Sequence, residues 1–321
     1  MRIELNQAIE MLNSHDNILI LAHRNPDGDA LGSGYALCRA LRSVGKNAEF
    51  KYFDKIPKVF LELEACCENT DFEPSFVVAV DCADSKILGD FPDGRYKEKV
   101  DLCIDHHSSN TLYAKYTYLD DNAAATSEII LDIARAIGAE IDTLTAQAIY
   151  IGLSTDTGCF RYSNTTSKTM RMAADMMDAG INAGKLNRIL FETKSKSYAA
   201  LEAMALATLT KHFSEKCAIM HITLEMHEKS GTDETEIHAL ASLPRQIEGV
   251  LVGATIKEAE PGRYKVSIRT NPPVNASEIC QIFGGGGHKR AAGCEIHGTL
   301  SEVKKQLLDA IEPFVRDVDP E

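Results

Sequence analysis

The sequence has no pair of cysteines at the C-x-x-C spacing that thiolate metal sites and redox motifs use. Its nine cysteines are odd in number and include the adjacent pair Cys66-Cys67. Such a set argues against a disulfide framework and against a thiolate zinc site. We therefore expect a protein of the reducing cytoplasm.

The sequence also has no apolar run near the roughly 20 residues that cross a bilayer. Its first residues include the acids Glu4, Glu10 and Asp16 instead of a basic head followed by a long apolar core. This pattern differs from that of a secretory signal peptide. We expect neither a membrane span nor a membrane partner.

Positive charge is scarce in this chain. The formal net charge is −13 at pH 7, and proteins that coat long DNA or RNA depend on basic surface and counterion release. An acidic protein can still bind a short nucleotide in one local basic pocket. The charge therefore argues against long nucleic acid as a partner and leaves small nucleotides and short RNA.

The length of 321 residues, without internal repeats, predicts two folded domains. From residue 17 to about 150, buried-strand patterns alternate with helical periodicity, which is typical of a doubly wound α/β domain with a parallel sheet. A smaller α+β unit follows. The predicted boundaries are 1–190 for the first domain, 191–214 for a helical connector and 215–321 for the second domain. The predicted strands are 18–22, 76–80, 102–104, 217–224, 250–256 and 264–269, and the predicted helices are 30–44, 124–137, 143–155, 193–211 and 302–314.

Acidic residues and histidines form four clusters, three of which directly follow predicted strands: His23-x-x-x-Asp27-Gly-Asp29, Asp81, Asp105-His106-His107 and Asp156. Ligands of open α/β sheets bind at the carboxyl ends of the strands. Five carboxylates and three imidazoles at one edge would repel one another and lose hydration unless something cationic lay among them. A pair of divalent metal ions is the simplest answer. Carboxylate and imidazole ligands without thiolate suit manganese, with magnesium or cobalt as substitutes.

Each cluster also has an ordinary structural interpretation when it is taken alone. The segment 25–29 fits a turn followed by a helix start, and Asp81 and Asp156 fit a strand end and a turn. The adjacent imidazoles of His106 and His107 are harder to hold beside a carboxylate without a metal or a phosphate. The joint occurrence of all four clusters, in this order, favours a functional site.

A second motif lies near the C-terminus, where four glycines precede His288-Lys-Arg290. Glycines let backbone N–H groups turn towards an anion, although four in a row also fit a flexible loop. The stretch from Arg263 to Arg290 has five basic residues and one acid, Glu278, so it is locally basic in an acidic protein. Arg269, at the end of a predicted strand, fits either a phosphate ligand or a solvated charge.

The order of the four clusters resembles that of the DHH phosphoesterase superfamily. The run Phe283-Gly-Gly-Gly-Gly-His288-Lys-Arg-Ala-Ala-Gly293 resembles the glycine-rich motif of the DHHA1 domain. The length and the two-domain layout are similar to those of the nano-RNases that also act as 3′-phosphoadenosine 5′-phosphate phosphatases. The resemblance implies a two-metal enzyme that hydrolyses short oligoribonucleotides to mononucleotides and that phosphoadenosine nucleotide to AMP.

The resemblance also implies a role for each residue. Asp81 would bridge the two ions, with His23 and Asp27 in one site and with Asp29, His106 and Asp156 in the other. The two catalytic residues would be Asp105, which orients its neighbours, and His107, which meets the substrate phosphate. The residues that would bind the terminal nucleotide are Arg269, Gly285, Gly286, Gly287, His288 and Arg290.

Other interpretations stay open at this point. Related proteins that hydrolyse cyclic or linear diadenylates carry membrane and sensory domains, and related single-strand DNA exonucleases carry further DNA-binding domains; neither is evident here. A nucleotide sensor without turnover could use the same fold, but it would not need every carboxylate. A dinucleotide-cofactor loop at Gly32-Ser-Gly34 is disfavoured, because Leu37 stands where a third glycine is wanted. The sequence does not decide between a monomer and a homodimer.

Overall fold

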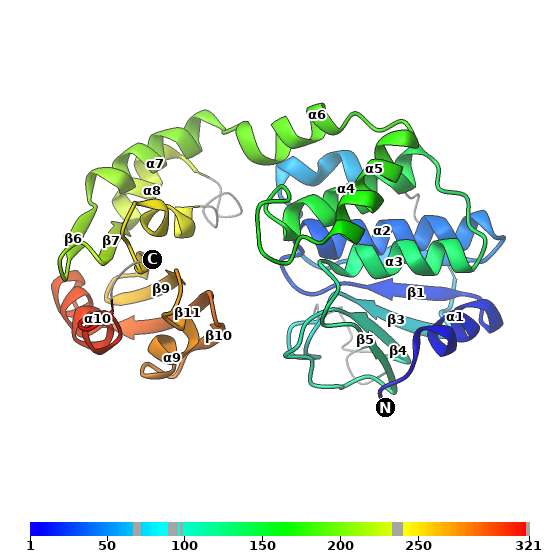
Figure 1. Ribbon diagram of the computed structural model, residues 1–321, viewed down its shortest axis with the longest axis horizontal. Helices are drawn as coiled ribbons and strands as arrows, with labels where there is room; N and C mark the ends of the chain where they lie inside the picture. Colours follow the sequence, from blue (N-terminus) through cyan, green and yellow to red (C-terminus); the bar gives the residue numbers. More distant parts are fainter. Residues whose placement is uncertain (67–71, 89–95, 97–98, 233–239, 319–321) are drawn as a thin grey trace. The chain divides into compact units, whose positions relative to one another are not determined.

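The computed structural model describes residues 1–66, 72–88, 96, 99–232 and 240–318. The chain forms two compact units, Met1–Thr193 and Lys194–Glu321 (Figure 1). Each unit has its own sheet and its own hydrophobic core. The predicted fold class is confirmed: the first unit is built on a parallel sheet, and the second unit on a separate, mixed sheet.

Five parallel strands form the first sheet, in the order β2-β1-β3-β4-β5. They are β1 Ile18–Leu21, β2 Ala48–Lys51, β3 Phe76–Val80, β4 Leu102–Asp105 and β5 Tyr116–Leu119. After β2 the chain returns to the other side of β1, so the strand order reverses between β1 and β3. Such a switch point opens a crevice at the carboxyl ends of these two strands, where sheets of this kind bind ligands.

Helices lie against one face of this sheet (Figure 1). The elements of this layer are α1 Leu5–Ser14, α2 Gly28–Ser43, η1 Lys58–Cys66, α3 Thr126–Ala136, α4 Thr143–Asp156, α5 Ser167–Asp178, α6 Ala183–Asn187 and η2 Arg188–Glu192. Ile18 and Ile20 of β1 face the helices, while Leu19 and Leu21 face a second apolar cluster on the opposite side. Burial on both faces explains why this strand is apolar throughout.

Helices α2 and α4 approach closely because glycines occupy their contact. A Cβ at Gly32 would lie 2.4 Å from the carbonyl oxygen of Ala148, and a Cβ at Gly28 would lie 2.4 Å from Thr155 Oγ1. These glycines therefore serve helix packing and not a dinucleotide loop. The packing holds the first residues of α2 against the last turn of α4.

Six strands form the sheet of the second unit, in the order β10-β11-β9-β8-β7-β6. They are β6 Thr210–His212, β7 Cys217–Ile222, β8 Val252–Glu260, β9 Arg263–Thr270, β10 Gly286–His288 and β11 Ala291–His297. Two clusters of buried side chains involve α9 Ala276–Gln281 and α10 Leu300–Val315 in one case and α7 Lys196–Ala207 in the other. The short elements α8 Leu224–Ser230 and η4 Pro244–Gln246 complete the unit.

The predicted strands and helices are present within a few residues of their predicted bounds. The segment predicted as a helix over 193–211 forms α7, whose buried Leu201 and Ala205 pack with Met220 of the second unit. The strands and α-helices that the sequence did not predict are α1, β2, β5, α5, α6, β6, α8, α9, β10 and β11. Within the described ranges, no helix has the length and apolar character needed to span a membrane.

Candidate metal centre

The four predicted clusters of the first unit come together at the switch point of its sheet. His23 follows β1, Asp81 follows β3, and His106 and His107 follow β4. Asp27 is the N-cap of α2, Asp29 lies in its first turn, and Asp156 is the last residue of α4. Local turns and helix ends from five elements therefore deliver these side chains to one place.

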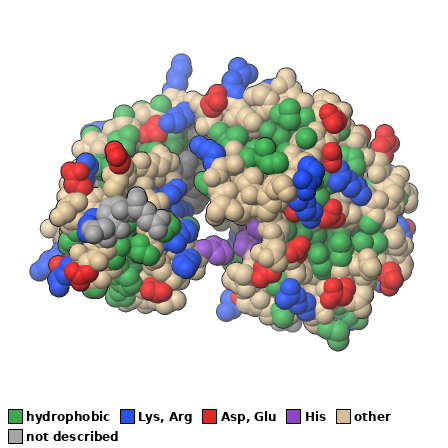
Figure 2. Space-filling model, in the orientation of Figure 1, with side chains coloured by type: hydrophobic (Ala, Val, Ile, Leu, Met, Phe, Trp, Pro, Cys, Tyr) green, Lys and Arg blue, Asp and Glu red, His purple; other side chains and the backbone are tan. Residues whose placement is uncertain are grey.

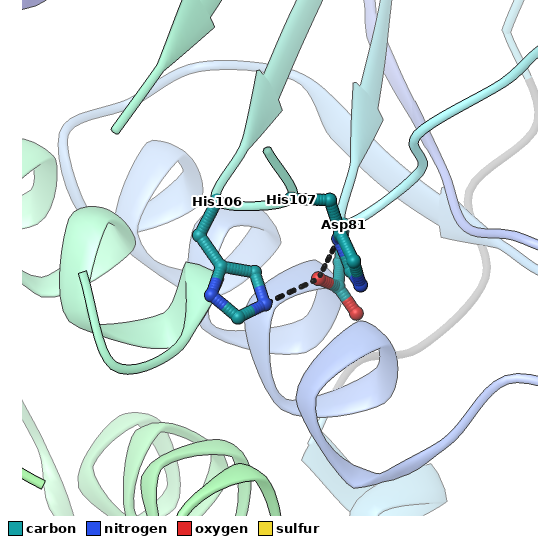
Figure 3. A group of neighbouring side chains, drawn as sticks. All are labelled: Asp81, His106 and His107. Atoms are coloured by element: carbon teal, nitrogen blue, oxygen red, sulfur yellow. Dashed lines mark ion pairs between the residues drawn. The ribbon is translucent and has the colours of Figure 1, made fainter. Parts of the chain in front are cut away.

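The Asp81 carboxylate lies between imidazoles (Figure 3). Its Oδ1 atom is 3.7 Å from His106 Nε2 and 3.5 Å from His107 Nδ1, and its Oδ2 atom is 3.8 Å from His23 Nε2. The His106 ring also lies 3.3 Å from Asp156 Oδ2, and the His23 ring lies 3.9 Å from Asp27 Oδ1. Asp81 thus stands between two groups of potential ligands.

Two of the histidines are oriented by backbone carbonyl groups. His23 Nδ1 lies 2.7 Å from the carbonyl oxygen of Arg24, and His106 Nδ1 lies 3.2 Å from that of Ala123. Because a carbonyl oxygen only accepts hydrogen bonds, each Nδ1 carries the proton. In the neutral ring each Nε2 then presents its lone pair to the carboxylates, which is the usual arrangement of a metal-binding histidine.

Three sets of side chains can each offer ligand atoms that all lie within 4.8 Å of one another: His23, Asp27 and Asp81; Asp29, His106 and Asp156; and Asp81, His106 and His107. The first two sets are the groups that the family resemblance implies, except that Asp81 belongs to only one of them here. The third set adds His107, whose role the geometry alone leaves between metal ligand and substrate contact. This donor set of carboxylates and imidazoles, without thiolate, fits a divalent cation.

The buried carboxylates of this cluster repel one another electrostatically. Burial raises the pKa of Asp81 well above its usual range, and the charges of Asp29 and Asp27 raise it further. Burial and the same two neighbours also raise the pKa of Asp156. Two buried acids whose charged forms are disfavoured mark a site where a positive charge would be stabilising.

The Asp105 side chain forms hydrogen bonds with residues that follow it closely in the sequence. Its Oδ1 accepts hydrogen bonds from His107 Nδ1, at 2.8 Å, and from the backbone N–H groups of His106 and His107. Its Oδ2 accepts one from Asn110 Nδ2, at 2.6 Å. Burial acts to raise the pKa of Asp105, but the hydrogen bond and charge of His107 lower it overall. Asp105 is thus an ionised carboxylate that fixes the His107 ring.

Asp29 and Asp27 both cap helices. The Asp27 side chain accepts hydrogen bonds from the N–H groups of Asp29 and Ala30 at the start of α2. Asp29 is 1% exposed and accepts hydrogen bonds from the N–H groups of Thr126 and Ser127 at the start of α3. The ordinary interpretation of segment 25–29, a capped helix start, is therefore correct and compatible with a metal site.

The structure adds partners that the sequence did not single out. Asn110 contacts Asp105, Thr126 contacts Asp81, and Ser33 and Ser127 contact Asp29. The sequence contains a hint for two of these partners. Thr126 and Ser127 lie at the start of a predicted helix, where hydroxyl side chains commonly form hydrogen bonds. Their carboxylate partners are far away in the sequence and were not foreseeable.

The expected substrate residues lie in the second unit. Arg269 of β9 pairs in register with Ala291 of β11, and Ala291 pairs with His288 of β10. Residues that face each other across adjacent strands point to the same side of a sheet, so Arg269 and His288 share one face with a small residue between them. Figure 2 shows Lys and Arg side chains, in blue, close together on part of the visible face of this unit.

Two of the four successive glycines belong to a strand, which the sequence did not predict. Gly286, Gly287 and His288 form β10, which pairs with β11 at the edge of the sheet. A Cβ at Gly287 would lie 2.6 Å from the carbonyl oxygen of Ala291, and a Cβ at Gly285 would lie 2.3 Å from that of Gly293. These two glycines therefore permit tight strand packing. Arg290, in the turn after β10, donates a hydrogen bond to the carbonyl oxygen of Val274.

Comparison with known proteins agrees with this arrangement. Residues 17–153 match the DHH family, N-terminal domain, and residues 215–317 match the DHHA1 domain. The bifunctional oligoribonuclease and PAP phosphatase NrnA of Thermus thermophilus is 32% identical over 303 residues, which are 92% of this chain and 89% of that protein. The protein of the same name from Bacillus subtilis is 29% identical over 312 residues, 94% of this chain and 96% of that protein.

Solved structures show the same fold. An exopolyphosphatase-related protein from Bacteroides fragilis has a TM-score of 0.87 at 22% identity, with 98% of this chain and 97% of that chain covered. RecJ of Thermus thermophilus, solved in complex with Mn²⁺, has a TM-score of 0.57 at 15% identity, covering 98% of this chain and 55% of that chain.

The fold and the side-chain cluster define the class of the molecule, a metal-dependent hydrolase of phosphoesters. Within that class the chain belongs to the DHH family, and its second unit is a DHHA1 domain.

Proposed function

We propose that this protein hydrolyses short oligoribonucleotides to mononucleotides, and 3′-phosphoadenosine 5′-phosphate to AMP, with two divalent metal ions. The observation that carries the proposal is the position of Asp81, whose two oxygens face different histidines in two separate groups of potential ligands. Two relatives named bifunctional oligoribonuclease and PAP phosphatase, similar over nearly their whole lengths, support the choice of substrates. The working compartment that fits this chemistry and the free thiols is the cytoplasm.

Six residues would hold the metals. His23 and Asp27 would bind one ion, Asp29, His106 and Asp156 would bind the other, and Asp81 would bridge them. This ligand set favours manganese, with magnesium or cobalt as substitutes. When bound, two such ions would activate water and neutralise charge on the phosphate.

The remaining residues of the DHH loop would act on the substrate. Because Asp105 accepts a hydrogen bond from His107 Nδ1, the other ring nitrogen is the one proposed to contact the scissile phosphate. The hydrogen bond also raises the pKa of His107 against the opposing effect of burial. A protonated ring at this place would stabilise negative charge that develops on the phosphate oxygens.

The second unit would bind the terminal nucleotide. Arg269 and His288 would contact its phosphate and base or ribose, with the backbone of Gly285, Gly286 and Gly287 close by. Arg290 would support this surface through its hydrogen bond to Val274 and through its charge. The stretch from Arg263 to Arg290 has only five basic residues, which suits a short substrate and not long nucleic acid.

A substrate panel with the purified protein and Mn²⁺ tests this function. It comprises di- to pentaribonucleotides, a 40-residue RNA, single-stranded DNA, cyclic and linear diadenylates and 3′-phosphoadenosine 5′-phosphate. We expect the short ribonucleotides and the phosphoadenosine nucleotide to be hydrolysed fastest, as measured by chromatography of the products. Faster turnover of diadenylates or of long RNA would contradict the assignment, and binding without turnover would indicate a sensor.

Arg269→Ala is expected to raise KM for dinucleotides about tenfold or more and to leave kcat nearly unchanged. A charge-assisted hydrogen bond contributes about 1.5 to 3 kcal/mol, and its loss from ground and transition state alike appears in KM. Steady-state kinetics on a dinucleotide and on bis(p-nitrophenyl) phosphate, which has no second nucleotide, measure the effect. The generic ester should be unaffected.

Two matched variants control for this result. Arg269→Lys keeps the positive charge but loses the planar guanidinium with its several N–H donors, so it should retain only part of the affinity for the dinucleotide. Lys265→Ala removes a charge from the same strand, at an exposed position, and should have little effect. Equal losses on the dinucleotide and the generic ester after Arg269→Ala would mean that the second unit supports catalysis instead of binding the nucleotide.

A further inference from the structure

The first turn of helix α3 is tied to two of the proposed metal ligands. Its N-cap is Ala125, which has no side-chain acceptor for the N–H groups that a helix start leaves unpaired. The N–H groups of Thr126 and Ser127 donate instead to Asp29 of α2, at 2.6 and 2.9 Å. A carboxylate of the metal cluster therefore caps α3 from another helix.

The same turn also contacts Asp81 through a side chain. Thr126 Oγ1 donates a hydrogen bond to Asp81 Oδ1 at 2.8 Å. Both residues are buried, with Thr126 0% and Asp81 2% exposed. Solvent is thus a poor substitute for this hydroxyl, and the hydrogen bond has a strong orienting effect.

The hydrogen bond selects one of the two oxygens of Asp81. Oδ1 is the atom that faces His106, and Oδ2 is the atom that faces His23. The terminal torsion of an aspartate is broad, so nothing intrinsic to the side chain holds this division.

We propose that Thr126 is a positioning residue of the metal centre, whose hydroxyl holds Asp81 Oδ1 towards the Asp29, His106 and Asp156 group. This inference rests on the proposed function, since it assumes that Asp81 bridges two ions. It goes further in assigning Thr126 to one of the two sites. Loss of the hydroxyl weakens the site that includes His106 and spares the site that includes His23.

The surroundings of the turn are consistent with a fixed geometry. Ser127 Oγ donates to Asp29 Oδ1 at 2.6 Å, so neighbouring hydroxyls hold two different carboxylates. A Cβ at Gly152 of α4 would lie 1.9 Å from Ser127 Oγ and 2.7 Å from Asp29 Oδ1. A side chain at this position would displace Ser127 Oγ or Asp29 from their present contact.

The test compares Thr126→Val, which removes the hydroxyl at almost constant shape, with Thr126→Ser, which keeps it. Calorimetric titration of the metal-free proteins with Mn²⁺ is expected to show two bound ions in the wild type. In Thr126→Val one ion should bind about 10- to 100-fold more weakly, the range found for loss of a residue that orients a metal ligand. Thr126→Ser should bind both ions within about threefold of wild type.

Two double variants, in which Thr126→Val is combined with the loss of a ligand of one site, identify the affected site. In Asp27→Asn the proposed site with His106 stays complete, and there Thr126→Val should weaken the remaining ion by the same factor. In Asp156→Asn the site with His23 stays complete, and Thr126→Val should have no effect. Thr117→Val is the matched control, because Thr117 Oγ1 is a buried hydroxyl without a partner among the described residues. That control should leave both affinities unchanged.

The outcomes separate this inference from the proposed function. If the wild type binds two ions and Thr126→Val binds them equally well, the role of Thr126 is overturned and the proposed function stands. If the wild type binds fewer than two ions, both fail. A lower melting temperature of metal-free Thr126→Val without a change in affinity would reveal a purely structural role and overturn the inference. Should Thr126→Val not fold, Thr126→Ala removes the same hydroxyl and is judged by the same affinities.

Discussion

Asp81→Asn is expected to prevent binding of the metal pair and to lower kcat/KM by about a thousandfold or more. The two proposed sites share this carboxylate, and bound metals stabilise a phosphoryl transition state by several kcal/mol, with about 1.4 kcal/mol for each factor of ten. Asparagine is the appropriate replacement because Asp81 has φ +53°, a left-handed conformation that asparagine adopts more readily than alanine. Steady-state kinetics and metal analysis of the purified variant measure both effects.

Asp27→Asn is the comparison for this variant. The Asp27 side chain is 61% exposed and belongs to one group of ligands, so its loss should weaken one ion and leave the other bound. The fall in activity should be clearly smaller than for Asp81→Asn. Two ions bound to Asp81→Asn with wild-type affinity would refute the bridging role.

The metal-free protein should respond to Asp81→Asn in the opposite direction. Burial, followed by the charges of Asp29 and Asp27, raises the pKa of Asp81 above its ordinary value of 3.8. The folded state keeps this proton after the unfolded chain has lost it, so stability falls as pH rises from 3.8 through the raised pKa. In chelator at neutral pH the variant should therefore melt at a higher temperature than wild type, and the difference should close as the pH is lowered towards 3.8.

His107→Ala is expected to lower kcat by about 100- to 1000-fold on both the dinucleotide and the generic ester. A hydrogen-bond donor that stabilises developing charge contributes an effect of this size. The fold should survive, because the Asp105 side chain keeps two backbone N–H donors and the amide of Asn110. Single-turnover kinetics at saturating substrate measure the chemical step.

Metal binding distinguishes the two roles that the geometry allows His107. If it contacts the substrate, the alanine variant binds both Mn²⁺ ions with affinities close to those of the wild type. If it is a ligand, as its grouping with Asp81 and His106 would allow, one ion is lost together with the activity. The second result would move His107 from the catalytic residues to the metal ligands.

The sequence predicted the parallel sheet and the members of the central cluster because both signals are local. β1 and β3 are short apolar runs, β4 is an apolar run that ends in Asp105, and the first acid or histidine after each strand lies within two residues of its end. Parallel topology then brings strand ends together without any knowledge of long-range contacts. Asn110, Thr126 and Ser127 escaped prediction because each acts through a hydrogen bond to an acid; for Thr126 that acid, Asp81, is 45 residues away.

The elements that were missed have weak or ambiguous signals. β2 has Glu49 and Lys51 among its four residues, and β5 buries only alternate residues, so neither is a continuous apolar run. Four successive glycines fit a flexible loop or an anion-binding segment, and glycine is rare inside strands, so the sequence contains no signal for β10 at Gly286 and Gly287. This strand forms through close approach to Ala291 and Gly293, a tertiary effect that composition does not report.

The double use of the helix-capping aspartates affects how distant relatives should be interpreted. Asp27 and Asp29 each supply acceptors to the start of a helix, so selection for folding alone can retain them after catalysis is lost. The ion-pair partner of the Asp156 side chain within the described residues is His106, and no helix start depends on it. In a descendant that has lost catalysis, Asp156 should therefore be replaced by other residues before Asp27 and Asp29 are. An aspartate at the position of Asp156 is better evidence of an active enzyme than aspartates at the positions of Asp27 and Asp29.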